Sequence, residues 1–192
     1  MLRIVHVLLI LGLLPASAWA EQGDAPRRTS GFFLGAGLGY NQVDLQNEQI
    51  KLSGGDVTYR VFAGYQFPRY AFMPFDSFFA IEGGYMDLGN IDDEAVGANF
   101  ELDIHGFDLY MTGYLPITGR FDIFGKAGVY LWDAKVKADN QTIDDDNGSD
   151  LALGVGVEYR SGGAYSARLT LESLDMLDGA WVATLAGSWQ FK

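Results

Sequence analysis

Apolar and polar residues alternate along this chain in repeated segments of about ten residues. In the last segment, residues 181–191, aromatic and aliphatic side chains occupy the odd-numbered positions and mostly small or polar side chains the even-numbered ones. Because successive side chains of a strand point to opposite faces, this period of two predicts a β-strand with one apolar face. The pattern recurs, and it predicts eight strands: 31–40, 57–67, 78–88, 102–115, 121–132, 151–160, 165–174 and 181–191.

The face with the large apolar residues points to a membrane. A soluble sheet would have to bury that face, whereas a membrane barrel turns it to lipid and keeps small or polar residues inside. No later segment has a long apolar run, and helices and closed barrels are the structures that satisfy all backbone polar groups in lipid. The fold class predicted for residues 31–192 is therefore all-β, an eight-stranded antiparallel up-and-down transmembrane β-barrel.

The lengths of the connections predict the orientation of this barrel. Segments 116–120 and 161–164 are short, and segment 68–77 is somewhat longer. Segments 41–56, 89–101 and 134–150 are long and polar, and 174–179 connects the last two strands. Outer-membrane barrels have short periplasmic turns and longer extracellular loops, so we expect the short turns and both termini in the periplasm.

The first twenty residues predict export. Arg3 is followed by the apolar run Ile4 to Leu14 and by the small-x-small sequence Ala18-Trp19-Ala20, the features of a secretory signal peptide. The run is shorter than the roughly 20 apolar residues that a spanning helix needs. We expect cleavage after Ala20, which leaves residues 21–30 as a polar periplasmic leader.

Composition narrows the possible functions. The chain has 192 residues, no cysteine, 25 glycines and a formal net charge of -12. Eight spanning strands with their connections use nearly all of the mature length, and without cysteine no disulfide or thiol chemistry is available. The acidic charge and the lack of a basic stripe exclude nucleic acid as an expected partner.

Several short segments resemble a known family, namely Gly35 to Tyr40, Gly64 to Phe67, Ala80 to Gly89, Gly154 to Tyr159 and Ser188 to Phe191. In order and spacing the chain is similar to the transmembrane domain of the outer-membrane protein A and opacity-porin type. The resemblance implies an eight-stranded barrel in a Gram-negative outer membrane, inserted by the barrel-assembly machinery. It also implies a lumen plugged by charged residues at positions matching Glu82, Lys126, Glu158 and Arg168. Because the sequence stops at Lys192, we expect no peptidoglycan-binding domain.

The predicted facing places seven charged residues in the lumen: Arg60, Glu82, Asp108, Lys126, Glu158, Arg168 and Glu172. Ionised groups that lose their hydration need partners and hydrogen bonds, so we expect a network of ion pairs. Two interpretations stay open, a network that specifies the fold and a switchable gate for small ions. Since an eight-stranded interior is filled by side chains, a general diffusion pore is not expected.

One histidine suggests an alternative in which the barrel modifies lipid A. His105 is the only histidine after the signal peptide, and Asp103 lies two residues away on the same face of its strand. A general base also needs a nucleophile within reach, and no His-x-Ser sequence follows. We therefore predict a non-enzymatic protein without catalytic residues or cofactors.

Acidic residues are concentrated in the predicted extracellular loops: Asp92, Asp93, Glu94, Asp144, Asp145, Asp146 and Asp150. Their oxygens could bind a hard cation or bridge to lipopolysaccharide phosphates through divalent ions. The spacing does not fit an EF-hand, and a solvated acidic loop is the simpler interpretation, so no metal site is predicted. The function expected for this barrel is a structural, surface-interaction or adhesion role through its extracellular loops. The expected partners are outer-membrane lipids and lipopolysaccharide, with a host surface or a phage as candidates for the loops.

Overall fold

The computed structural model describes residues 29–47, 50–68, 77–95, 98–138, 141–175 and 179–191. Where these ranges include residues of 43–54, 91–102 and 136–144, the description covers the backbone and not the side chains. Within these ranges the chain forms strands joined by turns. They are β1 (Gly31–Asn47), β2 (Ile50–Gly54), β3 (Val57–Gln66), β4 (Phe78–Ala95), β5 (Ala98–Pro116), β6 (Phe121–Ala138), β7 (Gln141–Arg160), β8 (Tyr165–Leu174) and β9 (Ala180–Gln190). No helix among the described residues is long and apolar enough to cross a membrane.

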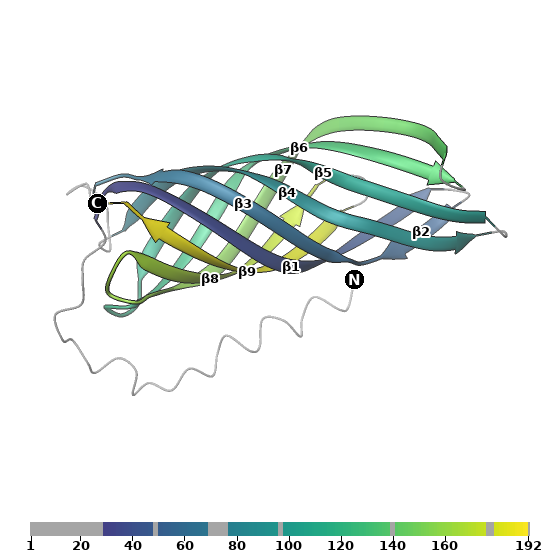
Figure 1. Ribbon diagram of the computed structural model, residues 1–192. Coiled ribbons are helices and arrows are strands. Elements are labelled where there is room, and N and C mark those ends of the chain that lie inside the picture. The colour runs from purple at the N-terminus through teal and green to yellow at the C-terminus, as the bar shows by residue number, and fades with distance from the viewer. Residues whose placement is uncertain are drawn as a thin grey trace.

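The strands form one closed antiparallel barrel (Figure 1). β1 pairs with β3, each strand from β3 to β8 pairs with the next, and β9 pairs back onto β1 over residues 180–190. β2 pairs with the outer part of β1 and leads into β3 after Gly55 and Asp56, so the wall of the barrel has eight strands. The predicted eight-stranded fold is confirmed.

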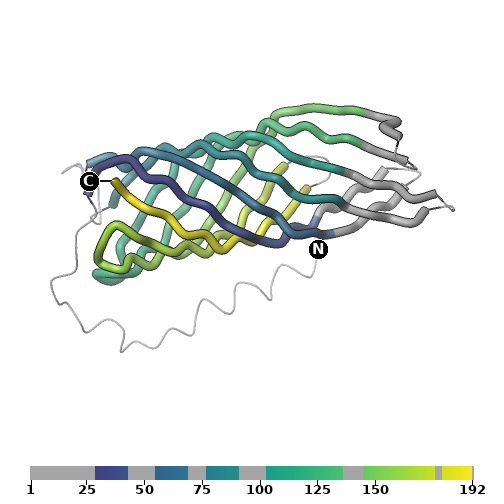
Figure 2. Tube along the Cα trace, viewed as in Figure 1, coloured from purple at the N-terminus to yellow at the C-terminus, as the bar shows by residue number. Residues whose placement is uncertain are grey.

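The strands cross the wall obliquely, as the tube in Figure 2 shows. A path that starts at Arg168 and moves from partner to partner around the barrel, through β9, β1, β3, β4, β5 and β6, reaches β7 at Gly148. Glu158, the direct partner of Arg168 on β7, lies ten residues further along that strand. Such a stagger requires tilted strands and, with eight of them, gives an interior just wide enough for side chains.

The facing predicted from the alternation is confirmed. Large apolar side chains stand on the outside, where Phe32 is 67% exposed and Leu185 64%, while their neighbours Phe33 and Ala186 are buried. In β3 the exposed and buried positions alternate from Val57 to Phe62. The outer surface is thus the apolar belt that a bilayer requires.

The long connections differ from the expectation. Segments 41–56, 89–101 and 134–150 are mostly strand, because β1, β4, β5, β6 and β7 continue as paired hairpins, as far as Ala138 opposite Gln141. These hairpins project at the end of the barrel opposite to the C-terminus (Figure 1). Their backbone pairing needs no apolar face, so the hydrophobic pattern gave no signal for strand here.

Some predictions fall on residues that the structure does not describe. The predicted signal peptide 1–20 and residues 21–28 of the leader lie outside the described ranges, as do residues 69–76 of the predicted turn 68–77 and residues 176–178 of the last connection.

Two apolar clusters fill the lumen, one on each side of its middle along the barrel axis. The outer cluster, near the long hairpins, contains Met86, Leu88, Ile104, Tyr110, Tyr130, Trp132, Ala134, Ala152, Leu174, Ala180 and Val182. The turn-side cluster, near the short turns, contains Phe33, Phe62, Ala80, Tyr114, Phe124 and Ala186. The charged residues of the lumen lie between these clusters.

Candidate functional site

The structure places all seven predicted lumen charges inside the barrel, each at most 5% exposed. They come from consecutive strands, and they are Arg60 on β3, Glu82 on β4, Asp108 on β5, Lys126 on β6, Glu158 on β7, and Arg168 and Glu172 on β8. Four carboxylates therefore face three cations in one layer, which brings together residues that are far apart in the sequence.

Glu82 is the centre of this layer, because it contacts all three cations. Its Oε2 accepts a hydrogen bond from Arg168 Nη1 at 2.8 Å, and its Oε1 accepts from both terminal nitrogens of Arg60 at 3.2 Å. Lys126 Nζ lies 3.8 Å from Glu82 Oε1. A single carboxylate thus links β3, β6 and β8 across the lumen.

Each arginine also has a carboxylate of its own. Arg60 donates from Nε and Nη2 to the two oxygens of Asp108, at 2.7 and 2.6 Å. This bidentate geometry is the strongest form of an arginine–carboxylate pair. Arg168 donates from Nε to Glu158 at 2.7 Å, so both guanidinium groups bridge two acids.

The third cation, Lys126, pairs with the remaining acid of the layer. Its Nζ lies 2.8 Å from Glu172 Oε1 and 4.0 Å from the centre of the Tyr110 ring. The Tyr110 hydroxyl donates to Glu172 Oε2 at 2.8 Å. This tyrosine connects the charged layer to the outer cluster.

The long side chains have room because the neighbouring strands β1 and β9 carry small residues beside them, with Gly37 paired to Arg60 and Ala186 to Arg168. Gly37 on β1, with Thr184 and Ala186 on β9, faces Arg60 and Arg168 around a cavity of about 10 Å³. That volume holds roughly one water molecule. The described lumen is therefore closed at this level by packed, paired side chains.

Sequence reasoning missed one further ion pair. Asp122 is fully buried, and Arg160 donates to it from Nε at 2.9 Å and from Nη2 at 3.1 Å. Both residues lie on the inner face near the short turns, and Arg160 shares the inward parity of Glu158 on β7. The signal for Asp122 was its even spacing from Lys126, four residues later on the same strand.

In the charged layer the carboxylates and the cations neutralise one another. Desolvation costs several kcal/mol per ion, and it is offset only by good geometry and further hydrogen bonds. The distances above supply both, and arginine cations also stack on aromatic rings, with Arg168 Cζ 5.1 Å from the Phe33 and Phe62 ring centres. Such a layer fixes the register of six strands and blocks the lumen.

The predicted acidic loop residues are only partly described. The side chains of Asp92, Asp93, Glu94 and Asp144 lie outside the described residues. Asp145 and Asp146 are exposed on the outer part of β7, which is a strand rather than the predicted loop.

Asp150 differs from the expectation for a solvated loop acid, because it accepts a hydrogen bond from the buried Trp132 indole at 2.6 Å. The strand parity of β7 turns it toward the lumen. Among the residues with described side chains, no group of three or more His, Asp or Glu has a geometry suited to a metal ion.

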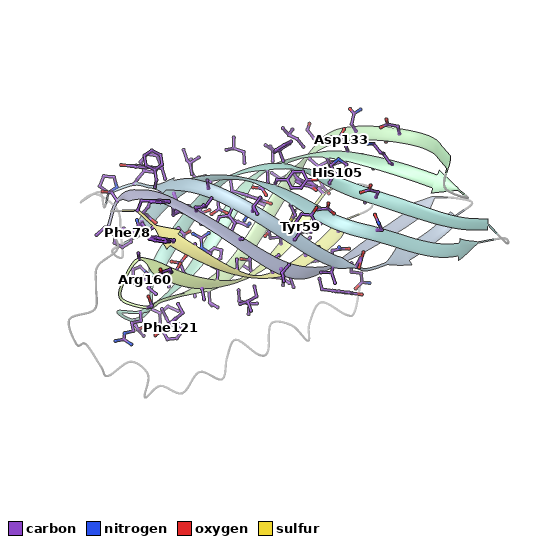
Figure 3. All side chains as sticks on the ribbon, in the orientation of Figure 1. Tyr59, Phe78, His105, Phe121, Asp133 and Arg160 are labelled. Carbon is purple, nitrogen blue, oxygen red and sulfur yellow. The ribbon has the colours of Figure 1, made fainter. Side chains whose placement is uncertain are left out.

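His105 lies on the outer surface of the wall, toward the end that carries the hairpins (Figure 3). Its Nδ1 is 3.5 Å from Asp103 Oδ1, and its strand partners are Asp87 on β4 and Asp133 on β6. The Tyr85 ring is 6.1 Å away, centre to centre. The structure thus brings the predicted pair together, in a group of carboxylates.

Several solved structures are similar to this chain. The crystal structure of Ail from Yersinia pestis has 15% sequence identity and a TM-score of 0.55, covering 84% of this chain and 99% of that one. Neisserial surface protein A has 14% identity and a TM-score of 0.57, covering 85% and 100%. OprG from Pseudomonas aeruginosa has 14% identity and a TM-score of 0.53, covering 88% and 99%. At these identities the likeness shows a shared fold.

The sequence itself carries the family assignment. A search of curated protein sequences finds no match. The family profile described as OmpA-like transmembrane domain matches residues 27–176, which is most of the chain and includes β1 to β8. The chain belongs to the OmpA-like transmembrane domain family and is an outer-membrane β-barrel.

Proposed function

We propose that this protein is a non-enzymatic surface-interaction protein whose outer hairpins bind a partner outside the cell. The observation that carries the proposal is the continuation of paired strands past the apolar belt, up to Ala138 opposite Gln141 in the β6–β7 hairpin. Paired backbone holds its residues in a fixed register, so such hairpins can present side chains as a preformed surface. The proposal includes export by residues 1–20 and periplasmic termini in a Gram-negative cell.

The charge of the hairpins indicates the chemistry of the partner. Segments 41–56, 87–103 and 133–150 contain fifteen Asp and Glu residues but only three Lys residues. The net charge of these segments is therefore -12, the same as the formal net charge of the whole chain. Among the described side chains, Asp133, Asp145 and Asp146 are exposed. Electrostatic complementarity favours a basic surface, or lipopolysaccharide phosphates bridged by divalent cations.

The negative charge of the hairpins argues against a polyanion as the partner, the class of ligand bound in the structure of one neighbour. The Ail structure was solved in complex with the heparin analogue sucrose octasulfate, a polyanion. Direct binding of a polyanion would place like charges together at these acidic hairpins. We therefore infer a host or phage surface with exposed basic residues as the partner, rather than a sulfated glycan.

The test uses a variant in which residues 136–144 of the β6–β7 hairpin are replaced by Asn-Gly, a sequence that suits a two-residue turn. Cells producing this variant should adhere to epithelial monolayers less well than cells producing the full chain. A variant with Asp144, Asp145 and Asp146 changed to Asn should lose adhesion without any change in hairpin length. Unchanged adhesion by both variants, with equal surface amounts of protein, would contradict the proposal.

Small-ion conduction is the second candidate, supported by the charged lumen. Conduction needs a continuous wet path, whereas the cavity beside Arg168 has room for roughly one water and lies between two apolar clusters. We infer a closed lumen. Planar bilayers containing the purified protein should show no single-channel steps, and regular steps abolished by Lys126→Ala would favour the channel instead.

The absence of an enzymatic function is also proposed. His105 contacts the Asp103 carboxylate and the Tyr85 ring, and neither supplies the serine nucleophile of an acyl-transfer site. Purified protein should leave lipid A unchanged in mass spectra. A loss of an acyl chain from lipid A that His105→Ala abolishes would overturn this inference.

A further inference from the structure

A hollow of about 700 Å³ lies on the lipid-facing surface of the barrel. It is lined mainly by outward positions of β4 to β9, joined by the inward pair Lys126 and Gly154, and its lining is almost entirely apolar. The large side chains along its walls are Phe79, Met111, Leu153, Val155, Leu171 and Trp181. These large side chains stand on the outer face of the barrel, since their positions alternate with the inward ones.

Three small residues form the floor of this hollow. Gly113 on β5 and Gly125 on β6 are direct cross-strand partners, and Ala127 is the next outward residue on β6. The lipid face of the barrel carries mostly large apolar side chains. Two adjacent glycines at outward positions, which have no side chains, therefore leave a depression in the outer surface where β5 and β6 pair.

The backbone does not require glycine at these two positions. A Cβ atom at Gly125 would have no neighbour closer than Gly154 O at 3.9 Å, and one at Gly113 would meet the Phe79 ring at 3.4 Å. At the inward Gly128, by contrast, a Cβ would overlap Leu109 O at 1.9 Å. Since glycine weakens a strand interior, the two outward glycines are explained by what the hollow accommodates.

The surroundings of the hollow identify its occupant. It is continuous with the apolar belt that contacts bilayer hydrocarbon, with Val155 and Leu153 of its wall exposed. An empty apolar hollow would forfeit dispersion contacts, and the unbranched chain of a lipid can follow its course. We propose that the hollow binds one acyl chain of a phospholipid, and we name it the acyl-chain groove.

The position of the two glycines in the groove favours a phospholipid over lipopolysaccharide. Gly125 lies four residues after Phe121 and Gly113 three residues before Pro116, so both are near the short turn that joins β5 to β6. With the proposed periplasmic turns, these two glycines lie in the inner, phospholipid leaflet, whereas Ser173 and Trp181 at the other end of the groove lie toward the hairpin end of the barrel. This step rests on the orientation proposed above, whereas acyl-chain binding itself does not.

The test measures lipid retention by native mass spectrometry of the full chain in detergent, titrated with dioleoylphosphatidylethanolamine. Gly125→Leu fills the groove. Gly187→Leu is the matched control, because Gly187 also faces lipid and a Cβ there would meet only Ser166 O at 4.0 Å, away from the groove. We expect one retained phospholipid, a loss of about tenfold in Gly125→Leu, and no loss in Gly187→Leu.

Heat-modifiable migration on gels verifies folding of each variant, and Gly113→Leu provides a second filled groove if Gly125→Leu does not fold. Equal retention by Gly125→Leu and Gly187→Leu would overturn the proposal. If the protein forms a dimer that Gly125→Leu disrupts and Gly187→Leu does not, the groove is instead an interface with a second copy of the chain. Preferential retention of added lipopolysaccharide would overturn the choice of phospholipid while leaving the proposed hairpin function untouched.

Discussion

The Arg168 guanidinium donates to Glu158 across β7 and β8 at 2.7 Å, in an environment where both side chains are almost fully buried. The two residues are also direct partners in the strand register. The pairing of backbone and side chains therefore coincides, so the ion pair can only form when β7 and β8 are in this register. The same guanidinium reaches Glu82 at 2.8 Å, which ties that register to the far side of the lumen.

This geometry predicts a strong effect of removing one partner. Arg168→Ala leaves two buried carboxylates without this cation, and breaking a buried pair costs about 3 to 5 kcal/mol. Changing Glu158 to Ala in the same protein removes one uncompensated charge, so the double variant should unfold at higher urea than Arg168→Ala. Arg120→Ala, in an exposed turn, is the control with a small effect. Additive losses in the double-mutant cycle would mean that the two residues do not interact.

Two buried threonines should respond differently to the same substitution. Thr58 Oγ1 accepts a hydrogen bond from Asn41 Nδ2 at 2.9 Å, whereas Thr112 Oγ1 is buried without a hydrogen-bond partner among the described residues. Thr58→Val should destabilise the barrel by about 0.5 to 1.5 kcal/mol, because the Asn41 amide loses one hydrogen bond while it keeps the carbonyls of Asp56 and Leu88 as acceptors. Thr112→Val removes an unsatisfied hydroxyl and should be neutral or stabilising. Urea unfolding of both variants measures the difference, and a larger loss for Thr112→Val would contradict it.

Two glycines on β6 provide a test of the facing. Gly128→Ala should prevent folding or destabilise the barrel severely, because the new Cβ would overlap the backbone of Leu109 at 1.9 Å. Gly125→Ala should be neutral or stabilise by about 0.5 to 1 kcal/mol, since its Cβ has space and the unfolded chain loses freedom. Heat-modifiable migration and urea unfolding report both effects. Similar behaviour of the two variants would show that the inner and outer faces are assigned incorrectly.

The orientation in the membrane can be tested by cysteine labelling, because the chain has no cysteine of its own. Asn147→Cys lies on the exposed outer part of β7, and Arg120→Cys in the short turn between β5 and β6. A membrane-impermeant maleimide should label Asn147→Cys on intact cells and Arg120→Cys only after permeabilisation. The opposite result would place the hairpins in the periplasm.

The fold, and the facing of most residues in the eight spanning strands, could be predicted from the sequence alone. The period of two assigns every side chain to one side of the wall, so the inward position of Arg60, Glu82 and Lys126 followed from parity. It also determined the closed barrel, because apolar side chains on the outside require lipid. These features depend on local pattern, which the sequence displays directly.

Only the tertiary structure decided which charges meet. The pairing of Arg168 with Glu82, 86 residues apart, depends on the stagger of the strands around the barrel, which alternation does not specify. The outer hairpins depend on backbone pairing between polar segments, and the acyl-chain groove depends on Gly113 lying opposite Gly125. Each of these is a matter of register between strands, and register is fixed by the closed barrel as a whole.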